Sequence, residues 1–257
     1  MSNAQPSRAA TKRQQRLEQR AELKRAGGQS PSLFKPTSME MKTIRPMTPN
    51  QELAFEAYDD EMHLFLHGCA GTGKTFISLY MALKEIFAGK SECNRVVIIR
   101  TAQSSKDIGF LPGSEKQKAE VYEAPYKALC SELFGRGDAY DILKQRGTIE
   151  FHTTSFLRGT TIDKAIIIVD EVQNQRYSEI RTVLTRVGNC SKIILCGDTR
   201  QDDLTSERYK EQSGIQDMME VLNKMGSIET VQFGTDDIVR SGFVREFIIA
   251  EYELGKY

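Results

Sequence analysis

The segment HGCAGTGKTF, residues 67–76, contains the first residues whose types and spacing indicate chemistry. It follows the pattern G-x-x-x-x-G-K-[ST], in which glycines let backbone N–H groups approach and cradle phosphate oxygens. Lys74 would reach the β- and γ-phosphates of a nucleotide, and the hydroxyl of Thr75 would bind Mg²⁺, which prefers oxygen ligands. We expect the nucleotide to be bound by Gly68, Cys69, Ala70, Gly71, Thr72, Gly73, Lys74, Thr75 and Phe76.

An acidic pair, Asp170 and Glu171, follows the apolar run of residues 165–169. Open α/β sheets bind ligands at the carboxyl ends of their strands, so this pair would lie beside the phosphate loop. Asp170 would hold Mg²⁺, directly or through a water, and Glu171 would be the base that polarises an attacking water. Two acids after an apolar strand are often only a strand end, so the interpretation depends on the loop upstream.

Two glutamines complete the expected site. Gln201 follows the run ILCGD, where an amide can contact the γ-phosphate and respond to its loss; the alternative is a polar turn. Gln51 precedes a predicted helix, and its amide suits the donor and acceptor edge of adenine; the alternative is a surface glutamine. We therefore expect ATP as the nucleotide, with Lys74, Glu171 and Gln201 among the catalytic residues.

The elements that must position these residues alternate between strands and helices. Apolar runs predict strands at residues 63–68, 95–101, 148–154, 164–171, 191–198 and 227–233. A helix over 51–60, capped by Thr48 or Asn50, precedes the first strand, and a helix ending at Gly89 follows the loop. Because several runs are apolar at every position, the strands are expected to be covered on both faces. The sequence predicts an α/β fold, three layers around a mostly parallel sheet.

Charge divides the chain into a tail and a body. Residues 1–45 contain 10 Lys and Arg against 3 Asp and Glu, although the whole chain has 35 of each sign. We expect residues 1–45 to form a flexible or helical tail and residues 46–257 to form the folded domain. The basic tail is either a solvated arm or a contact for nucleic-acid phosphates. The five cysteines form no C-x-x-C pair, which argues against a zinc site. No apolar run is long enough to span a membrane, and we expect a cytoplasmic protein.

Five segments, taken in order, resemble the PhoH-like family, whose members are ATPases of a single RecA-like domain related to superfamily 1 helicases. They are GCAGTGKT, VVIIRTAQSSKDIGFLPGS, FLRGTTIDKAIIIVDEVQN, LTRVGNCSKIILCGDTRQDDL and DIVRSGFV. The resemblance covers roughly Thr48–Tyr257. It implies ATP hydrolysis, a ring-shaped homo-oligomer with a hexamer favoured, and a link with single-stranded nucleic acid, usually RNA. The chain departs from the family pattern at RTAQSS, which replaces an Arg-Pro beginning, and at DEVQN, which replaces DEAQN.

A single domain of this kind has no second domain to supply an arginine to its own nucleotide. We therefore expect an arginine from a neighbouring subunit, which would require a heterologous ring. Arg240 is the first candidate, followed by Arg245, Arg186 and Arg158, and for each the alternative is a surface arginine.

The segment DIGFLPGS, residues 107–114, is expected to lie near the ring opening or a subunit interface. Nearby lysines could meet nucleic-acid phosphate there; they are Lys106, Lys116 and Lys118. The alternative is an ordered packing loop with solvated lysines.

The motifs favour an Mg²⁺-dependent ATPase stimulated by single-stranded RNA or DNA, with helicase or translocase action as a further expectation. An ATP-driven switch that remodels a protein is the alternative, since it would use the same catalytic residues. A small-molecule kinase is the weaker third interpretation, because no acceptor pocket is recognised in the sequence.

Overall fold

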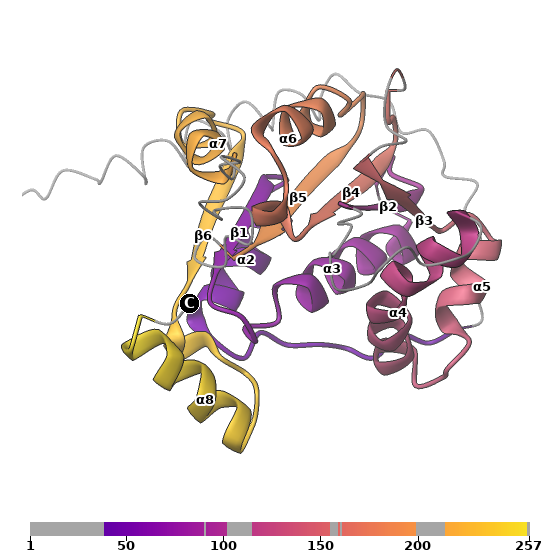
Figure 1. The fold of residues 1–257 in the computed structure, drawn as a ribbon. Coiled ribbons are helices and arrows are strands. Elements are labelled where there is room, and N and C mark those ends of the chain that lie inside the picture. The colour runs from indigo at the N-terminus through magenta and orange to yellow at the C-terminus, as the bar shows by residue number, and fades with distance from the viewer. Residues whose placement is uncertain are drawn as a thin grey trace, which may run out of the picture. The chain divides into compact units, whose positions relative to one another are not determined.

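Six strands form one sheet in which every neighbouring pair is parallel (Figure 1). The computed structural model describes residues 39–89, 91–101, 115–154, 159, 161–198 and 214–255. The strands are β1 (His63–Gly68), β2 (Arg95–Arg100), β3 (Ile149–Thr153), β4 (Ala165–Asp170), β5 (Lys192–Gly197) and β6 (Ile228–Phe233). Their spatial order is β3-β2-β4-β5-β1-β6. All six strands expected from the sequence are confirmed.

One described helix precedes the first strand, and the others lie between and after the strands. They are α2 (Pro49–Asp59), α3 (Lys74–Ala88), α4 (Glu115–Phe134), α5 (Ala139–Gln145), α6 (Tyr177–Leu184), α7 (Ile215–Leu222) and α8 (Gly242–Glu253). Two short 3-10 segments, η2 (Val172–Asn174) and η3 (Thr235–Asp237), follow β4 and β6.

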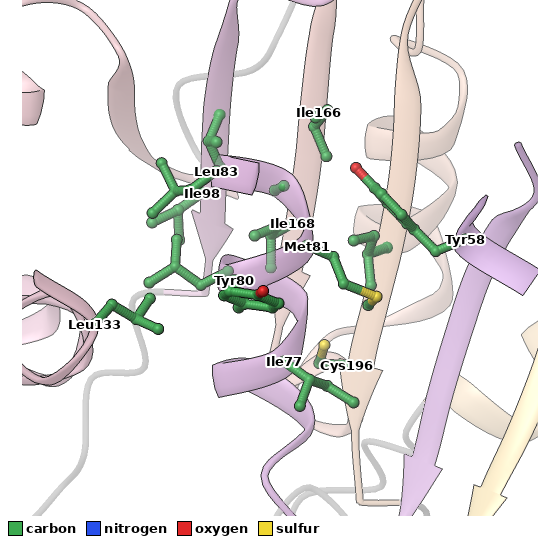
Figure 2. Packing of buried hydrophobic residues seen from close by; sticks show 14 of the residues in the cluster. Tyr58, Ile77, Tyr80, Met81, Leu83, Ile98, Leu133, Ile166, Ile168 and Cys196 are labelled. Atoms are coloured by element: carbon green, nitrogen blue, oxygen red, sulfur yellow. The ribbon is translucent and has the colours of Figure 1, made fainter. Parts of the chain in front are cut away.

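Helices cover the sheet on both faces because its strand side chains alternate between two cores. Ile166 and Ile168 of β4 belong to the core formed with α2, α3, α4 and α5, whereas Ile167 and Val169 belong to the core formed with α6 and α7. Figure 2 shows the first core, in which α3 side chains such as Tyr80 pack beside the strands. The three-layer α/β fold around a parallel sheet that we expected from the sequence is confirmed.

The two helices nearest the phosphate loop begin and end where the sequence indicates. Thr48 caps α2, its hydroxyl accepting from the backbone N–H of Gln51 over 3.3 Å. Gly73 precedes α3 with a φ of 79°, and Gly89 ends it with a φ of 60°. Glycine adopts this left-handed conformation without the steric cost that a Cβ brings. The loop can therefore turn directly into α3, which begins at Lys74.

Part of the segment expected to form the tail packs on the domain. Met39, Met41 and Ile44 contact the first core, and the backbone N–H of Lys42 donates to the carbonyl of Leu133 over 2.8 Å. The described end of this segment therefore belongs to the folded unit. The nature of the residues before it stays a prediction.

Across the described residues, every helix is too short or too polar to cross a membrane.

Candidate active site

A cleft of about 260 Å³ opens where β1, β4 and β5 end. It is lined by Ala70, Gly71, Thr72, Gly73, Lys74, Thr75, Phe76, Leu129, Asp170, Glu171, Cys196, Gly197, Asp198 and Arg240. The structure thus brings together most of the site residues expected from the sequence. Gln51, Gly68 and Cys69 lie outside this lining, and Gln201 lies outside the described residues.

The phosphate loop is packed tightly against the end of β6. A Cβ placed on Gly68, whose φ is 116°, would meet the carbonyl oxygen of Phe233 at 2.1 Å. Beyond Gly68, the N–H of Cys69 donates to the same carbonyl over 3.1 Å, and the N–H of Val239 donates to the carbonyl of Gly71 over 3.1 Å. Only glycine can occupy position 68 in this arrangement, and the loop is held by residues far away in the sequence.

Lys74 lies inside the loop, at the start of α3. Its ammonium donates to the carbonyl oxygens of Gly68 and Cys69 over 2.8 and 2.7 Å. Burial lowers the pKa of Lys74, while the charge of Asp198 acts in the opposite direction. The ammonium and the N-terminus of α3 concentrate positive potential where phosphate oxygens would bind.

Gln51 is hydrogen-bonded to the backbone of the phosphate loop. Its side chain is buried, its Oε1 accepts from the N–H of Met47 over 2.8 Å, and its Nε2 donates to the carbonyl of Thr72 over 3.0 Å. The structure therefore places this amide against the loop backbone. Contact with adenine, which we expected of Gln51, stays a prediction.

Asp170 is buried at the end of β4 and receives a hydrogen bond on each carboxylate oxygen. Thr75 Oγ1 donates to Oδ1 over 2.9 Å, and the hydroxyl of Tyr126 donates to Oδ2 over 2.7 Å. Thr75 and Asp170, the two expected Mg²⁺ ligands, are thus adjacent. No motif in the sequence marked Tyr126, which lies in α4, 44 residues before the aspartate.

Glu171 follows in a left-handed conformation, with a φ of 55°, and so turns away from the strand direction. Gln173 donates from Nε2 to a carboxylate oxygen of Glu171, and its Oε1 accepts from the N–H of Asp198 over 3.0 Å. Arg100 Nη2 lies 4.0 Å from Glu171 Oε1. Burial, followed by the charge of Asp170, raises the pKa of Glu171. A carboxylate with a raised pKa is a better proton acceptor, as a general base requires.

Gln173 is a site residue that we did not single out in the sequence, although it lies within the DEVQN run. It joins the end of β4 to the end of β5. Its position three residues after the aspartate, in the turn η2, is the signal that could have identified it.

The candidate arginines fall in different places. Arg240 lines the cleft of its own chain, and its Cγ lies 3.0 Å from where a Cβ on Gly71 would be. Action on the nucleotide of its own chain is therefore an alternative to the contribution to a neighbouring subunit that we expected of Arg240. Arg245 lies exposed on α8, and the carbonyl of Arg186 accepts from the N–H of Ile162, before β4. Arg158 lies outside the described residues.

Two oxygen donors, one at the end of β4 and one at the start of α3, suit Mg²⁺. Thr75 Oγ1 and Asp170 Oδ1 are hard oxygen donors that share one wall of the cleft. Across the described residues, no group of three His, Cys, Asp or Glu could hold a metal alone. Two protein oxygens match a cation that usually keeps several waters and binds substrate phosphates.

Comparison with known proteins identifies one family over most of the chain. The family model described as PhoH-like protein matches residues 43–253. A PhoH-like protein of Synechocystis sp. is 33% identical over 212 residues, which cover 82% of this chain and 62% of that protein. A PhoH-like protein of Mycobacterium leprae is 31% identical over 220 residues, which cover 82% of this chain and 60% of that protein. The chain therefore spans about three fifths of the length of these relatives.

Solved structures resemble the chain more distantly. The large terminase of a thermophilic bacteriophage aligns with a TM-score of 0.46 and 12% identity, covering 81% of this chain and 50% of its own. The Pif1 helicase of Candida albicans aligns with a TM-score of 0.40 and 14% identity, covering 82% of this chain and 44% of its own.

The contact between Gly68 and Phe233 can be tested with a matched pair of glycine substitutions. Gly147 also has a positive φ, 71°, but nothing lies within 4 Å of a Cβ placed on it. We expect G147A to lower the free energy of unfolding by about 1 kcal/mol, the usual cost of left-handed backbone for a non-glycine residue. G68A adds a steric clash with backbone, and we expect a loss of about 2 to 5 kcal/mol in urea unfolding. Equal losses would contradict the packing described for the loop.

Proposed function

We propose that this chain, which belongs to the PhoH-like family, is an Mg²⁺-dependent ATPase that hydrolyses ATP to ADP and phosphate. The observation that carries the proposal is the convergence of three groups in one cleft. The phosphate loop with Lys74, the pair of Thr75 and Asp170, and the carboxylate of Glu171 all line it. This set contains a phosphate cradle, a cation site and a base, the parts that hydrolysis of a nucleoside triphosphate requires.

Each group has a role that follows from its surroundings. The loop N–H groups and Lys74 would hold the phosphates and stabilise the charge that develops on them. Mg²⁺, held by Thr75 and Asp170, would supply Lewis-acid stabilisation of the phosphate oxygens. Glu171 would accept the proton of the attacking water, and Gln173 orients its carboxylate through a hydrogen bond.

Two finer parts of the proposal concern which nucleobase is bound and which residue responds to hydrolysis. Both ends of the Gln51 amide are hydrogen-bonded, to Met47 and Thr72, and an amide keeps a second N–H and a second lone pair with which it could meet adenine. Gln201 follows β5, whose end lines the cleft at Asp198. We propose ATP as the nucleotide and Gln201 as the residue that responds to loss of the γ-phosphate.

Paired substitutions separate nucleotide binding from hydrolysis. We expect K74A to lose both ATP binding and turnover, because the phosphates lose their buried cation. We expect E171Q to keep ATP binding, measured by calorimetry, while kcat falls by about 10² to 10⁴, the range for loss of a general base. E150Q is the matched control, since Glu150 of β3 pairs with Arg95 of β2 and does not line the cleft. Turnover at the wild-type rate in E171Q would refute Glu171 as the base.

The placement of Arg240 leads us to propose that it acts within its own subunit. Its guanidinium would then neutralise charge on the nucleotide bound by the same chain, an effect worth about 10³ or more in turnover. We expect R240A to lose activity and to regain none when mixed with K74A. If Arg240 instead acted on the nucleotide of a neighbouring subunit, the mixture would regain activity. A mixed pair would then contain one cleft with both Lys74 and Arg240. Recovery of ATPase activity in the mixture would therefore reassign Arg240 to the adjacent subunit.

We propose two kinds of partner, single-stranded nucleic acid and further copies of this chain. Support comes from the family resemblance and from the excess of Lys and Arg in residues 1–45. The second expected contact, residues 107–114 with Lys106, lies outside the described residues, and the side chains of Lys116 and Lys118 are not described either. An ATP-driven protein switch remains the alternative, since its catalytic residues would be the same.

Polynucleotide stimulation distinguishes these two functions. We expect single-stranded RNA or DNA to raise the ATPase rate at low salt, and the effect to fall as salt increases, because bound phosphates release counterions. Native mass measurement on the same sample tests the homo-oligomeric ring. An ATPase rate that neither polymer changes at low salt would favour the protein switch, while leaving the hydrolytic site as proposed.

A further inference from the structure

Tyr126 is a buried residue that touches the proposed cation site and has no place in the motifs described above. Its hydroxyl and the hydroxyl of Thr75 each donate to one oxygen of Asp170, over 2.7 and 2.9 Å. The two donors come from different helices, Tyr126 from α4 and Thr75 from α3. Tyr126 is 1% exposed and Asp170 is 5% exposed, so water has little access to replace either hydrogen bond.

The hydroxyl of Tyr126 is held in place by the packing of α4. One turn before it, the buried Glu123 pairs with Lys144 of α5 over 2.6 Å. One and two turns after it, Cys130 and Leu133 are fully buried in the first core. The Tyr126 ring also packs against Phe151 of β3, with ring centroids 5.8 Å apart. Because α4 is anchored on both sides of Tyr126, its hydroxyl is a fixed donor.

A fixed donor on Oδ2 restricts how the carboxylate of Asp170 can rotate. The terminal torsion of aspartate is broad, so a carboxylate held on one oxygen can turn and displace the other. With Tyr126 on Oδ2, Oδ1 stays beside Thr75 Oγ1, facing the cleft. A carboxylate oxygen can accept more than one partner, so Oδ1 keeps the capacity to bind a cation.

We propose that Tyr126 is a positioning residue that orients Asp170 for Mg²⁺. This inference rests on the proposed function, in which Thr75 and Asp170 hold the cation. Hydrogen bonds that orient metal ligands typically change metal affinity 10- to 100-fold when they are removed. Tyr126 would therefore affect the cation without contacting the nucleotide.

The test is an Mg²⁺ titration of nucleotide binding in the Y126F variant, which loses only the hydroxyl oxygen. The full chain is titrated with ADP in EDTA and then at increasing MgCl₂ concentrations, with binding followed by calorimetry. We expect the Mg²⁺ concentration for half-maximal enhancement of ADP binding to rise about tenfold in Y126F. Binding in EDTA should match the wild type, and excess Mg²⁺ should restore the enhancement.

Y80F is the matched control, because Tyr80 is a buried tyrosine of α3 that lies outside the cleft lining. Its Mg²⁺ titration should coincide with that of the wild type. Both variants are titrated at a temperature well below their thermal unfolding, which is followed by circular dichroism. Loss of the fold is then not mistaken for loss of the cation site.

The outcomes separate this inference from the proposed function. If Mg²⁺ does not enhance ADP binding by the wild type, the cation site itself fails. If the wild type responds to Mg²⁺ and Y126F gives the same titration curve, Tyr126 does not position Asp170. If Y126F weakens binding in EDTA as much as in Mg²⁺, Tyr126 only supports the general packing of the cleft, and the inference is again overturned.

Discussion

Parallel pairing of the six described strands puts their carboxyl ends at one edge of the sheet, and the candidate active site depends on it. His67 of β1 lies opposite Gly197 of β5, and Val169 of β4 lies opposite Leu195 of the same strand. A single strand, β5, therefore separates the phosphate loop from the acidic pair. If β5 were antiparallel to β1 and β4, Gly197 and Asp198 would lie at the opposite edge of the sheet and could not line the same cleft as the loop and the acids.

Lys74 and the carboxylates that line the cleft are partly or fully buried. Burial lowers the pKa of Lys74 and raises the pKa of Glu171, as expected when the charged form of each group loses hydration. Perturbed pKa values of this kind are typical of functional sites. Hydrogen bonds from Gln173 and Tyr126 offset part of the cost by satisfying the carboxylates of Glu171 and Asp170. Gln173 and Tyr126 thus both lower the cost of burying these carboxylates and fix their orientation.

The loop is shaped as much by its neighbours as by its glycines. Gln51 holds it through Thr72, and β6 holds it through Phe233. Asn50 donates to the buried Asp237 over 2.7 Å, which joins the start of α2 to the segment after β6. The start of α2 and the segment after β6 therefore meet beside the phosphate loop. Gln51 thus supports the loop, and its contact with adenine stays a prediction.

The sequence alone determined the strands, the loop and the acidic pair, because these are local patterns. Apolar runs such as residues 165–169 predict buried strands, and the spacing of Gly68, Gly73, Lys74 and Thr75 requires only neighbouring residues. Only the tertiary structure decided which distant residues complete the site. Tyr126 of α4 donates a hydrogen bond to Asp170, and Arg240 lies beside Gly71 in the cleft lining. Such contacts depend on the packing of α4 and on the course of the chain after β6, and neither leaves a periodic or spaced signal in the sequence.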